Sequence, residues 1–329
     1  MRTEVQKLVR GLDVVQRQMY FDAGRDIRRT TLLLGSARSG TTWLQEVLNH
    51  DQSFRVIFEP FHGSGPAVAQ GFRNRFIPPT VANPKRVQRF ETVLTGRFRN
   101  NWSNQYNSKR IVSRRLIKEI QITNLLPWIS AQFPSLGDIV YLIRNPWAVA
   151  DSRLGSKEET VAKWWSDLNR YLEQPSLMEG PFRSTGELLR SVHAKSAPDE
   201  LLVARWCAEN FIPIAAATDG RATFVFYEDL VRRPVQEFER LCDRLRVPRP
   251  ADIDKVLNRP SSRTSSSVGL SDMSSRIDRW KLRFGPKDLS RFRAILEPFG
   301  LGDLYGDDGL PTIGPDDLLS YSSGLAPSV

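Results

Sequence analysis

Cysteine and long apolar runs are both scarce in this sequence. The chain has only 2 cysteines, Cys207 and Cys242, among its 329 residues. Two cysteines are too few for a disulfide framework and suit a reducing compartment. No apolar run reaches the roughly 18 residues that a membrane-spanning helix needs. The N-terminal stretch (MRTEVQKLVRGLDVVQRQMY) is charged throughout and lacks the apolar core of a signal peptide. We therefore expect a cytoplasmic protein without a membrane span.

Acidic residues are nearly absent from one long stretch. Between Arg73 and Lys118 there are twelve Lys and Arg residues but a single acid, Glu91. The stretch is either a solvated basic face or a wall that binds anions. The net charge of the whole chain, +10, favours anionic partners but does not choose among nucleotide, acidic glycan, nucleic acid and membrane surface. No nucleic-acid-binding motif accompanies the charge, so we expect no nucleic-acid partner.

The most informative stretch is residues 30–44 (TTLLLGSARSGTTWL). Three leucines after two threonines predict a buried strand. Gly35 and Gly40 then bound a loop whose backbone can curl closely around an anion. From Thr41 onward the apolar residues have helical spacing. A strand, a loop and a helix start in this order direct backbone N–H groups and the helix dipole at one point. The sequence therefore predicts a phosphate-binding loop.

This loop lacks the lysine of nucleotide triphosphatases. Their pattern is G-x-x-x-x-G-K-[ST], whereas Thr41 follows Gly40 here and the cation, Arg38, lies inside the loop. A kinase-like or regulatory protein that binds ATP is the alternative hypothesis. A kinase needs Mg²⁺ and that lysine, so the amino-acid sequence of the loop argues against this alternative.

Residues 36–43 (SARSGTTW) resemble the 5′-phosphosulfate loop of the sulfotransferase family. Those enzymes transfer a sulfuryl group from 3′-phosphoadenosine 5′-phosphosulfate (PAPS) and release 3′-phosphoadenosine 5′-phosphate (PAP). The resemblance implies that no metal is needed and that Arg38 contacts the bridging oxygen of PAPS. It also implies nucleotide contacts from the rest of the loop, namely Ser39, Gly40, Thr41, Thr42 and Trp43. Trp43 either stacks on the adenine or is a buried aromatic at the helix start.

A second match lies in residues 144–152 (RNPWAVADS). Arg144 follows a predicted strand at 138–143, and its carboxyl end is where open α/β sheets bind ligands. Ser152 lies about two turns along the next helix. This spacing resembles the 3′-phosphate motif of the same family, so the resemblance implies that Arg144 and Ser152 grip the second phosphate. Tyr227, after a strand at 222–226, resembles a family adenine contact, or is a packed tyrosine.

Residues 280–284 (WKLRF) resemble a W-K-x-x-F motif of cytosolic family members. An amphipathic core helix is the alternative interpretation of these residues. The R-K-G that usually follows in the family is missing. Arg276 or Arg263 are the candidates to replace it in nucleotide binding.

The catalytic base differs between branches of the family. Members that act on phenols and steroids carry a histidine after a Lys-Thr pair, and residues 116–120 (LIKEI) contain none. Carbohydrate and tyrosyl-protein members use a glutamate beyond the phosphate-loop helix, the place that Glu59 occupies. The resemblance thus implies Glu59 as base, with His62 and Glu119 as alternatives, and Lys118 near the transferred group. The expected acceptor is a glycan or another small molecule with a hydroxyl.

Strands alternate with helices along the chain. This order predicts a three-layer α/β fold with a central parallel sheet, and the resemblance implies the P-loop NTPase-like sulfotransferase fold. We expect one domain over residues 1–305, with an inserted substrate region at about 66–110. Residues 306–329 are rich in Gly, Pro and Asp and predict a poorly ordered tail. The oligomeric state stays open.

Overall fold

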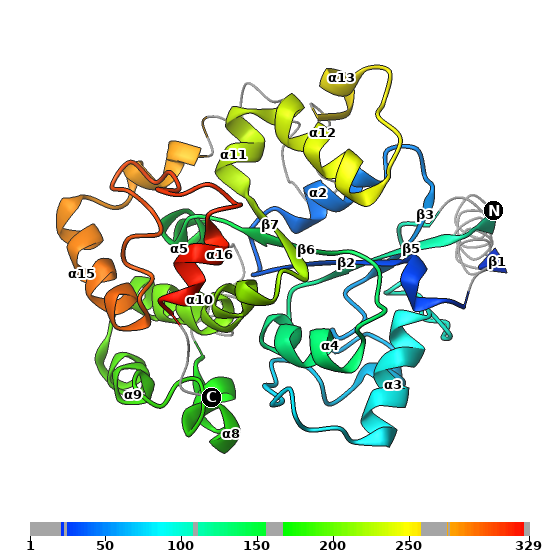
Figure 1. Ribbon diagram of the computed structural model, residues 1–329. Coiled ribbons are helices and arrows are strands. Elements are labelled where there is room, and N and C mark those ends of the chain that lie inside the picture. The colour runs from blue at the N-terminus through cyan, green and yellow to red at the C-terminus, as the bar shows by residue number, and fades with distance from the viewer. Residues whose placement is uncertain are drawn as a thin grey trace, which may run out of the picture.

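The computed structural model describes residues 21–22, 25–107, 111–155, 167–257, 275 and 277–325. Arg263 and Arg276, the two candidates to replace the missing C-terminal motif, lie outside the described residues. The centre of the protein is a sheet with helices on both faces (Figure 1). The predicted three-layer α/β fold with a parallel sheet is confirmed.

All five strands of the central sheet run parallel, in the order β3-β5-β2-β6-β7. The strands are β2 (Thr30–Gly35), β3 (Phe54–Phe58), β5 (Arg114–Glu119), β6 (Ile139–Ile143) and β7 (Ala222–Phe226). A separate parallel pair joins β1 (Phe21–Asp22) to β4 (Ile111–Val112). Parallel strands end at the same edge of their sheet. The residues that follow the five central strands therefore lie along one edge.

Alternate residues of the central strands supply two apolar layers. On β2, Leu33 packs in one core cluster, whereas Leu32 and Leu34 pack in the other, and all three are 0% exposed. Burial on both faces explains why this strand is a continuous apolar run and not an alternating one.

Helices cover both faces of the sheet (Figure 1). One face carries α2 (Thr41–Leu48), α11 (Tyr227–Arg232), α12 (Pro234–Leu245) and α13 (Ile253–Leu257). The opposite face carries α3 (Pro84–Leu94), α4 (Leu126–Gln132), α5 (Pro146–Leu154) and α10 (Pro198–Ala215). The remaining α-helices are α7 (Asn169–Leu172), α8 (Pro175–Met178), α9 (Gly186–Lys195), α15 (Pro286–Leu296) and α16 (Leu318–Ser323). Short 3₁₀ helices are η1 (Ile27–Arg29), η2 (Ala67–Ala69), η3 (Thr123–Leu125), η4 (Ala216–Asp219), η5 (Arg279–Leu282) and η6 (Glu297–Phe299).

The region expected to be an insertion contains α3 and then runs along the outer edge of β3. The Phe58 N–H donates to the Ser103 carbonyl at 2.8 Å, and the Val56 N–H donates to Asn107 Oδ1 at 2.8 Å. These contacts satisfy backbone groups that an edge strand would otherwise expose. They also bring Trp102 next to the end of β3.

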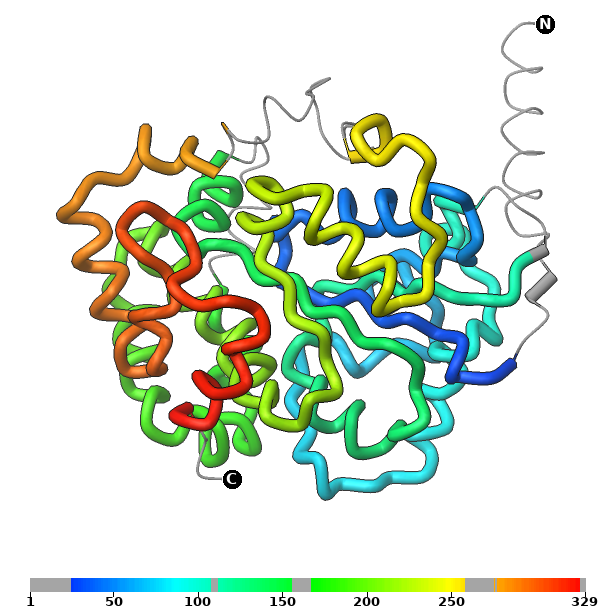
Figure 2. Tube along the Cα trace, turned by 45° about the horizontal axis from the view of Figure 1, so that its top comes forward, coloured from blue at the N-terminus to red at the C-terminus, as the bar shows by residue number. Residues whose placement is uncertain are grey.

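The C-terminal segment differs from the tail that its composition predicts. Residues 306–325 fold back on the protein, and α16 packs against η4 and α10 (Figure 2). Leu318 is 0% exposed, and Arg293 holds Asp307 in an ion pair of 2.6 Å. Composition suggested too little apolar surface for order, but a few well-placed apolar residues and ion pairs suffice to fix the segment.

Candidate active site

The loop after β2 closes tightly because of its two glycines. A Cβ atom on Gly35 would lie 2.6 Å from the Leu142 carbonyl oxygen. Gly40 has a φ of 96°, and a Cβ there would lie 2.7 Å from ring carbons of Tyr227. Glycine is therefore required at both ends of the loop.

The start of α2 offers an anion site. Its first turn holds Thr41, Thr42 and Trp43 and contains no acidic side chain. The N–H groups of a first helical turn have no partner within the helix and carry the positive end of its dipole. Inside the loop, the hydroxyls of Ser36 and Ser39 lie 2.7 Å apart in a hydrogen bond. Together these groups have the arrangement that the sequence predicts for a phosphate-binding loop.

Three chain segments meet at Arg38. Its Nε donates to Ser152 Oγ at 2.9 Å, and Arg144 Nη1 donates to the Arg38 carbonyl oxygen at 3.0 Å. The structure thus brings Arg38, Arg144 and Ser152 into direct contact, although more than a hundred residues separate the loop from the other two. The contact arises because β2 and β6 are neighbours and end at the same edge.

Two aromatic side chains line the back of the loop. The Arg144 guanidinium carbon lies 4.3 Å from the centre of the Tyr227 ring, a cation–π contact. Trp43 meets Tyr227 edge-on with ring centres 6.4 Å apart. Trp43 and Tyr227 are 5% and 4% exposed, so both rings are packed side chains in this structure. Trp43 also lines a cavity of about 250 Å³ beside α2.

Glu59 and Lys118 form a buried ion pair at the ends of β3 and β5. The two residues also share a backbone hydrogen bond of 2.8 Å, from the Glu59 N–H to the Lys118 carbonyl. Glu59 is 8% exposed and has a positive φ of 41°, an uncommon conformation for a non-glycine residue. The carboxylate is therefore held in one place beside a cation.

Glu119, the next residue along β5, ties the same two strand ends together. Its carboxylate accepts hydrogen bonds from the N–H groups of Phe61 at 2.9 Å, Ile120 at 2.7 Å and Gln121 at 2.9 Å. Burial and the nearby charge of Glu59 raise the pKa of Glu119 to about 7, against the effect of these bonds.

His62 lies in the same corner of the site. Its ring stacks on Trp102 with centres 4.4 Å apart, and the Trp102 indole N–H donates to the Glu59 carbonyl oxygen at 3.2 Å. The three candidates for a catalytic base, Glu59, Glu119 and His62, therefore occupy one region, at the ends of β3 and β5.

The sequence did not predict a buried charged cluster behind the loop, formed by Arg153, Arg205 and Glu209. Arg153 Nη2 donates to the Ala37 carbonyl at 3.0 Å and to Glu209 Oε2 at 2.6 Å, while Arg205 Nε donates to Glu209 Oε1 at 2.7 Å. Burial opposes ionisation of Glu209, but the two guanidiniums outweigh it and lower the pKa of this carboxyl. The spacing of Arg205 and Glu209, one helical turn apart, was the available signal, and it did not reveal the partner on α5.

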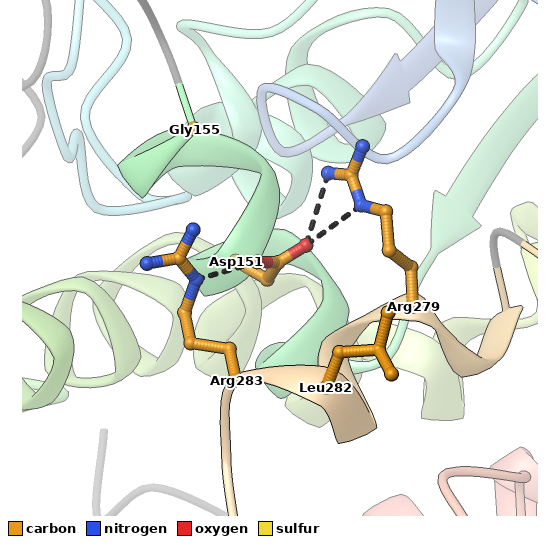
Figure 3. Close-up of a pocket in the computed structure, with 5 residues that line it drawn as sticks. All are labelled: Asp151, Gly155, Arg279, Leu282 and Arg283. Atoms are coloured by element: carbon orange, nitrogen blue, oxygen red, sulfur yellow. Dashed lines mark hydrogen bonds and ion pairs between the residues drawn. The ribbon is translucent and has the colours of Figure 1, made fainter.

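A second pair of arginines flanks Asp151, the neighbour of Ser152. Arg279 Nε donates to Asp151 Oδ2 at 3.0 Å, and Arg283 Nε donates to Asp151 Oδ1 at 2.7 Å (Figure 3). These side chains line a cleft of about 440 Å³ with Leu282. Trp280, from the C-terminal motif, is buried. The arginines at 279 and 283 thus connect the motif to the helix that carries Ser152.

Among the residues that the structure describes, no group of three or more His, Cys, Asp or Glu side chains is placed to hold a metal ion. Within the same ranges, no helix has both the length and the apolar character needed to cross a lipid bilayer.

Comparison with known protein families gives a match. A sequence profile described as the Sulfotransferase family matches residues 31–251, more than half of the chain. No curated protein matches this chain.

Several solved structures resemble the protein. A sulfotransferase domain from the curacin biosynthetic pathway is 17% identical, with a TM-score of 0.42, and the match covers 81% of this chain and 95% of that one. A sulfotransferase domain from the Synechococcus PCC 7002 olefin synthase is 16% identical, with a TM-score of 0.42 and coverage of 85% and 98%. A mouse sulfotransferase complexed with PAP is 15% identical, with a TM-score of 0.39 and coverage of 90% and 91%.

Proposed function

This chain belongs to the sulfotransferase family, and on that premise we propose that it transfers a sulfuryl group from PAPS to a hydroxyl of a carbohydrate or another small metabolite. The observation that carries the proposal is the contact of Arg144 and Ser152 with Arg38, in the loop between β2 and α2. PAPS has two anionic ends, and two cationic groups at neighbouring strand ends suit both of them.

The donor half of the site comprises the ends of β2, β6 and β7. We assign the 5′-phosphosulfate to the loop N–H groups of residues 39–43 and to Arg38, and the 3′-phosphate to Arg144 and Ser152. The two glycines hold the loop in this position, because they let its backbone pack against the Leu142 carbonyl and the Tyr227 ring. PAPS supplies the activated sulfuryl group. Guanidinium groups and helix N–H groups stabilise the negative charge that develops on the leaving oxygen.

The acceptor half comprises the ends of β3 and β5. Glu59 is the proposed base and takes the proton of the acceptor hydroxyl as its oxygen attacks sulfur. The ion pair with Lys118 fixes the position of this carboxylate. The absence of a histidine within β5 supports an acceptor of the carbohydrate class.

Both cysteines, Cys207 and Cys242, are free and buried, which suits a reducing compartment. We infer the cytoplasm as the location of the reaction.

Thermal stabilisation tests the donor assignment. PAP should raise the melting temperature of the protein at concentrations well above its Kd, whereas ATP with Mg²⁺ should give a much smaller shift. A preference for ATP with Mg²⁺ would favour the kinase-like alternative and refute the proposal. A screen of hydroxyl compounds with labelled PAPS then identifies the acceptor.

A further inference from the structure

The peptide group that follows Arg144 is held from both sides. Its carbonyl oxygen, which belongs to Arg144, accepts a hydrogen bond from Trp206 Nε1 at 2.9 Å. Its N–H, which belongs to Asn145, donates to Glu228 Oε1 at 3.0 Å. Trp206 lies on α10 and Glu228 on α11, so helices from opposite faces of the sheet fix one peptide plane. These two contacts set the direction in which the Arg144 side chain leaves the end of β6.

Tyr305, at the expected C-terminal end of the domain, contacts the side chains of both Trp206 and Glu228. Its hydroxyl donates to Glu228 Oε2 at 3.2 Å, and its ring meets Trp206 edge-on with centres 6.5 Å apart. The tyrosine is 2% exposed. Because the other carboxylate oxygen of Glu228 holds the Asn145 N–H, the Tyr305 hydroxyl fixes the rotation of that carboxylate.

The Asn145 side chain links the same region to the helix of Ser152. Its Oδ1 accepts from the Ala148 N–H at 3.1 Å and so caps α5, while its Nδ2 donates to the Gly309 carbonyl at 2.8 Å. Gly309 has a φ of 83°, and a Cβ there would lie 2.8 Å from Asn145 Nδ2 and 2.8 Å from the Trp280 ring. Only glycine allows this approach.

The segment that carries Tyr305 and Gly309 is itself well supported. Arg293 donates to the Gly302 carbonyl at 2.7 Å, and the Gly306 N–H donates to the Leu310 carbonyl at 2.9 Å. A supported loop with two contacts to one turn can act as a rigid brace.

We propose that residues 302–310 are a working part of the nucleotide site, in which Tyr305 and Gly309 are positioning residues for Arg144 and Ser152. The inference rests on the proposed function, because that function assigns Arg144 and Ser152 to the 3′-phosphate. Tyr305 acts through the Glu228 carboxylate, and Gly309 acts through the Asn145 side chain. The segment thereby sets the affinity for PAP without belonging to the acceptor half.

The first test is Tyr305→Phe in the full chain, which removes one hydroxyl and keeps the ring. The matched control is Tyr321→Phe, whose hydroxyl donates to the Gly300 carbonyl at 2.6 Å in the same C-terminal region. Calorimetric titration with PAP should show about threefold to tenfold weaker binding for Tyr305→Phe, the effect of one lost hydrogen bond, and wild-type binding for Tyr321→Phe. The KM for the acceptor should not change. Equal losses in both variants, or no loss in Tyr305→Phe, would overturn the inference.

Gly309→Ala provides a second test, because its methyl group pushes the loop away from Asn145. PAP binding should weaken by at least as much as in Tyr305→Phe, and wild-type affinity would contradict the brace. Arg144→Ala distinguishes failure of the proposed function from failure of the present inference. If that variant binds PAP like wild type, the proposed function fails. If it binds weakly while Tyr305→Phe and Gly309→Ala bind normally, only the present inference fails.

Discussion

At the scale of single residues, the site depends on charges that are held by partners before any ligand arrives. Glu59 forms an ion pair with Lys118, and Arg38 donates a hydrogen bond to Ser152. Pre-positioned charges need little reorganisation during the reaction, which is how electrostatic stabilisation becomes effective. Substitutions at these positions should therefore change binding or turnover selectively.

Glu59→Gln should keep the affinity for PAP within about twofold and lower turnover by roughly a hundredfold or more, because the amide cannot accept the hydroxyl proton. Calorimetry and initial rates with labelled PAPS measure the two effects. Glu91→Gln, in a loose surface pair with Arg97 at 3.9 Å, is the control and should change neither. Retained turnover in Glu59→Gln would move the role of base to His62 or Glu119.

Arg144→Ala should weaken PAP binding by about tenfold or more, equivalent to at least ~1.4 kcal/mol, because it removes a guanidinium from the proposed 3′-phosphate site. The KM for the acceptor should stay close to the wild-type value. Arg190→Ala removes an exposed arginine paired with Glu187 on α9 and serves as the control. Unchanged affinity in Arg144→Ala would contradict the proposed function.

At the scale of elements, helices α5 and α10 hold the phosphate loop from behind. Arg153 on α5 donates a hydrogen bond to the Ala37 carbonyl, and Glu209 on α10 forms ion pairs with both Arg153 and Arg205. The conformation of the loop thus depends on hydrogen bonds and ion pairs from these two helices as well as on apolar packing.

Glu209→Gln should destabilise the protein by about 3–5 kcal/mol, because it removes the buried carboxylate charge that the guanidiniums of Arg153 and Arg205 share. Urea unfolding monitored by circular dichroism measures this loss. Glu187→Gln on α9, where the carboxylate is 89% exposed, should change stability by less than about 0.5 kcal/mol. Equal stabilities for wild type and Glu209→Gln would show that the cluster contributes nothing.

The sequence was most informative where function depends on a local pattern. The strand at residues 30–35 and the helix start at Thr41 follow from leucines, glycines and helical spacing, and the structure places both there. The contact of Arg38 with Arg144 follows once strands β2 and β6 are neighbours. Arg153 and Tyr305 gave no such signal, because their partners lie more than fifty residues away in sequence. The order of residues 306–325 likewise depends on tertiary contacts that composition does not record.

At the scale of the whole molecule, two buried carboxyls make stability depend on pH. Burial raises the pKa of Glu119 to about 7, as it does that of Glu228, from a usual value of 4.5. The folded protein therefore binds protons at these groups that the unfolded chain has already released. Each group stabilises the fold at low pH, and this contribution is lost as pH rises through about 7.

The free energy of unfolding should thus fall between pH 5 and pH 8, by roughly 2 kcal/mol for each of these two groups. Urea unfolding at both pH values measures the difference. Glu119→Gln has no proton to lose at this position and should show a smaller fall than wild type. Identical pH dependence in the two proteins would mean that Glu119 titrates near its usual value.

The uniform direction of the five strands has a consequence for how such a protein diversifies. In the proposed function, the connections after β6 and β7 bind the nucleotide, and those after β3 and β5 bind the molecule that becomes sulfated, with the loop after β2 between them. Replacement of the connections after β3 and β5 would allow transfer to a different acceptor, while the connections after β6 and β7 would still bind the same donor.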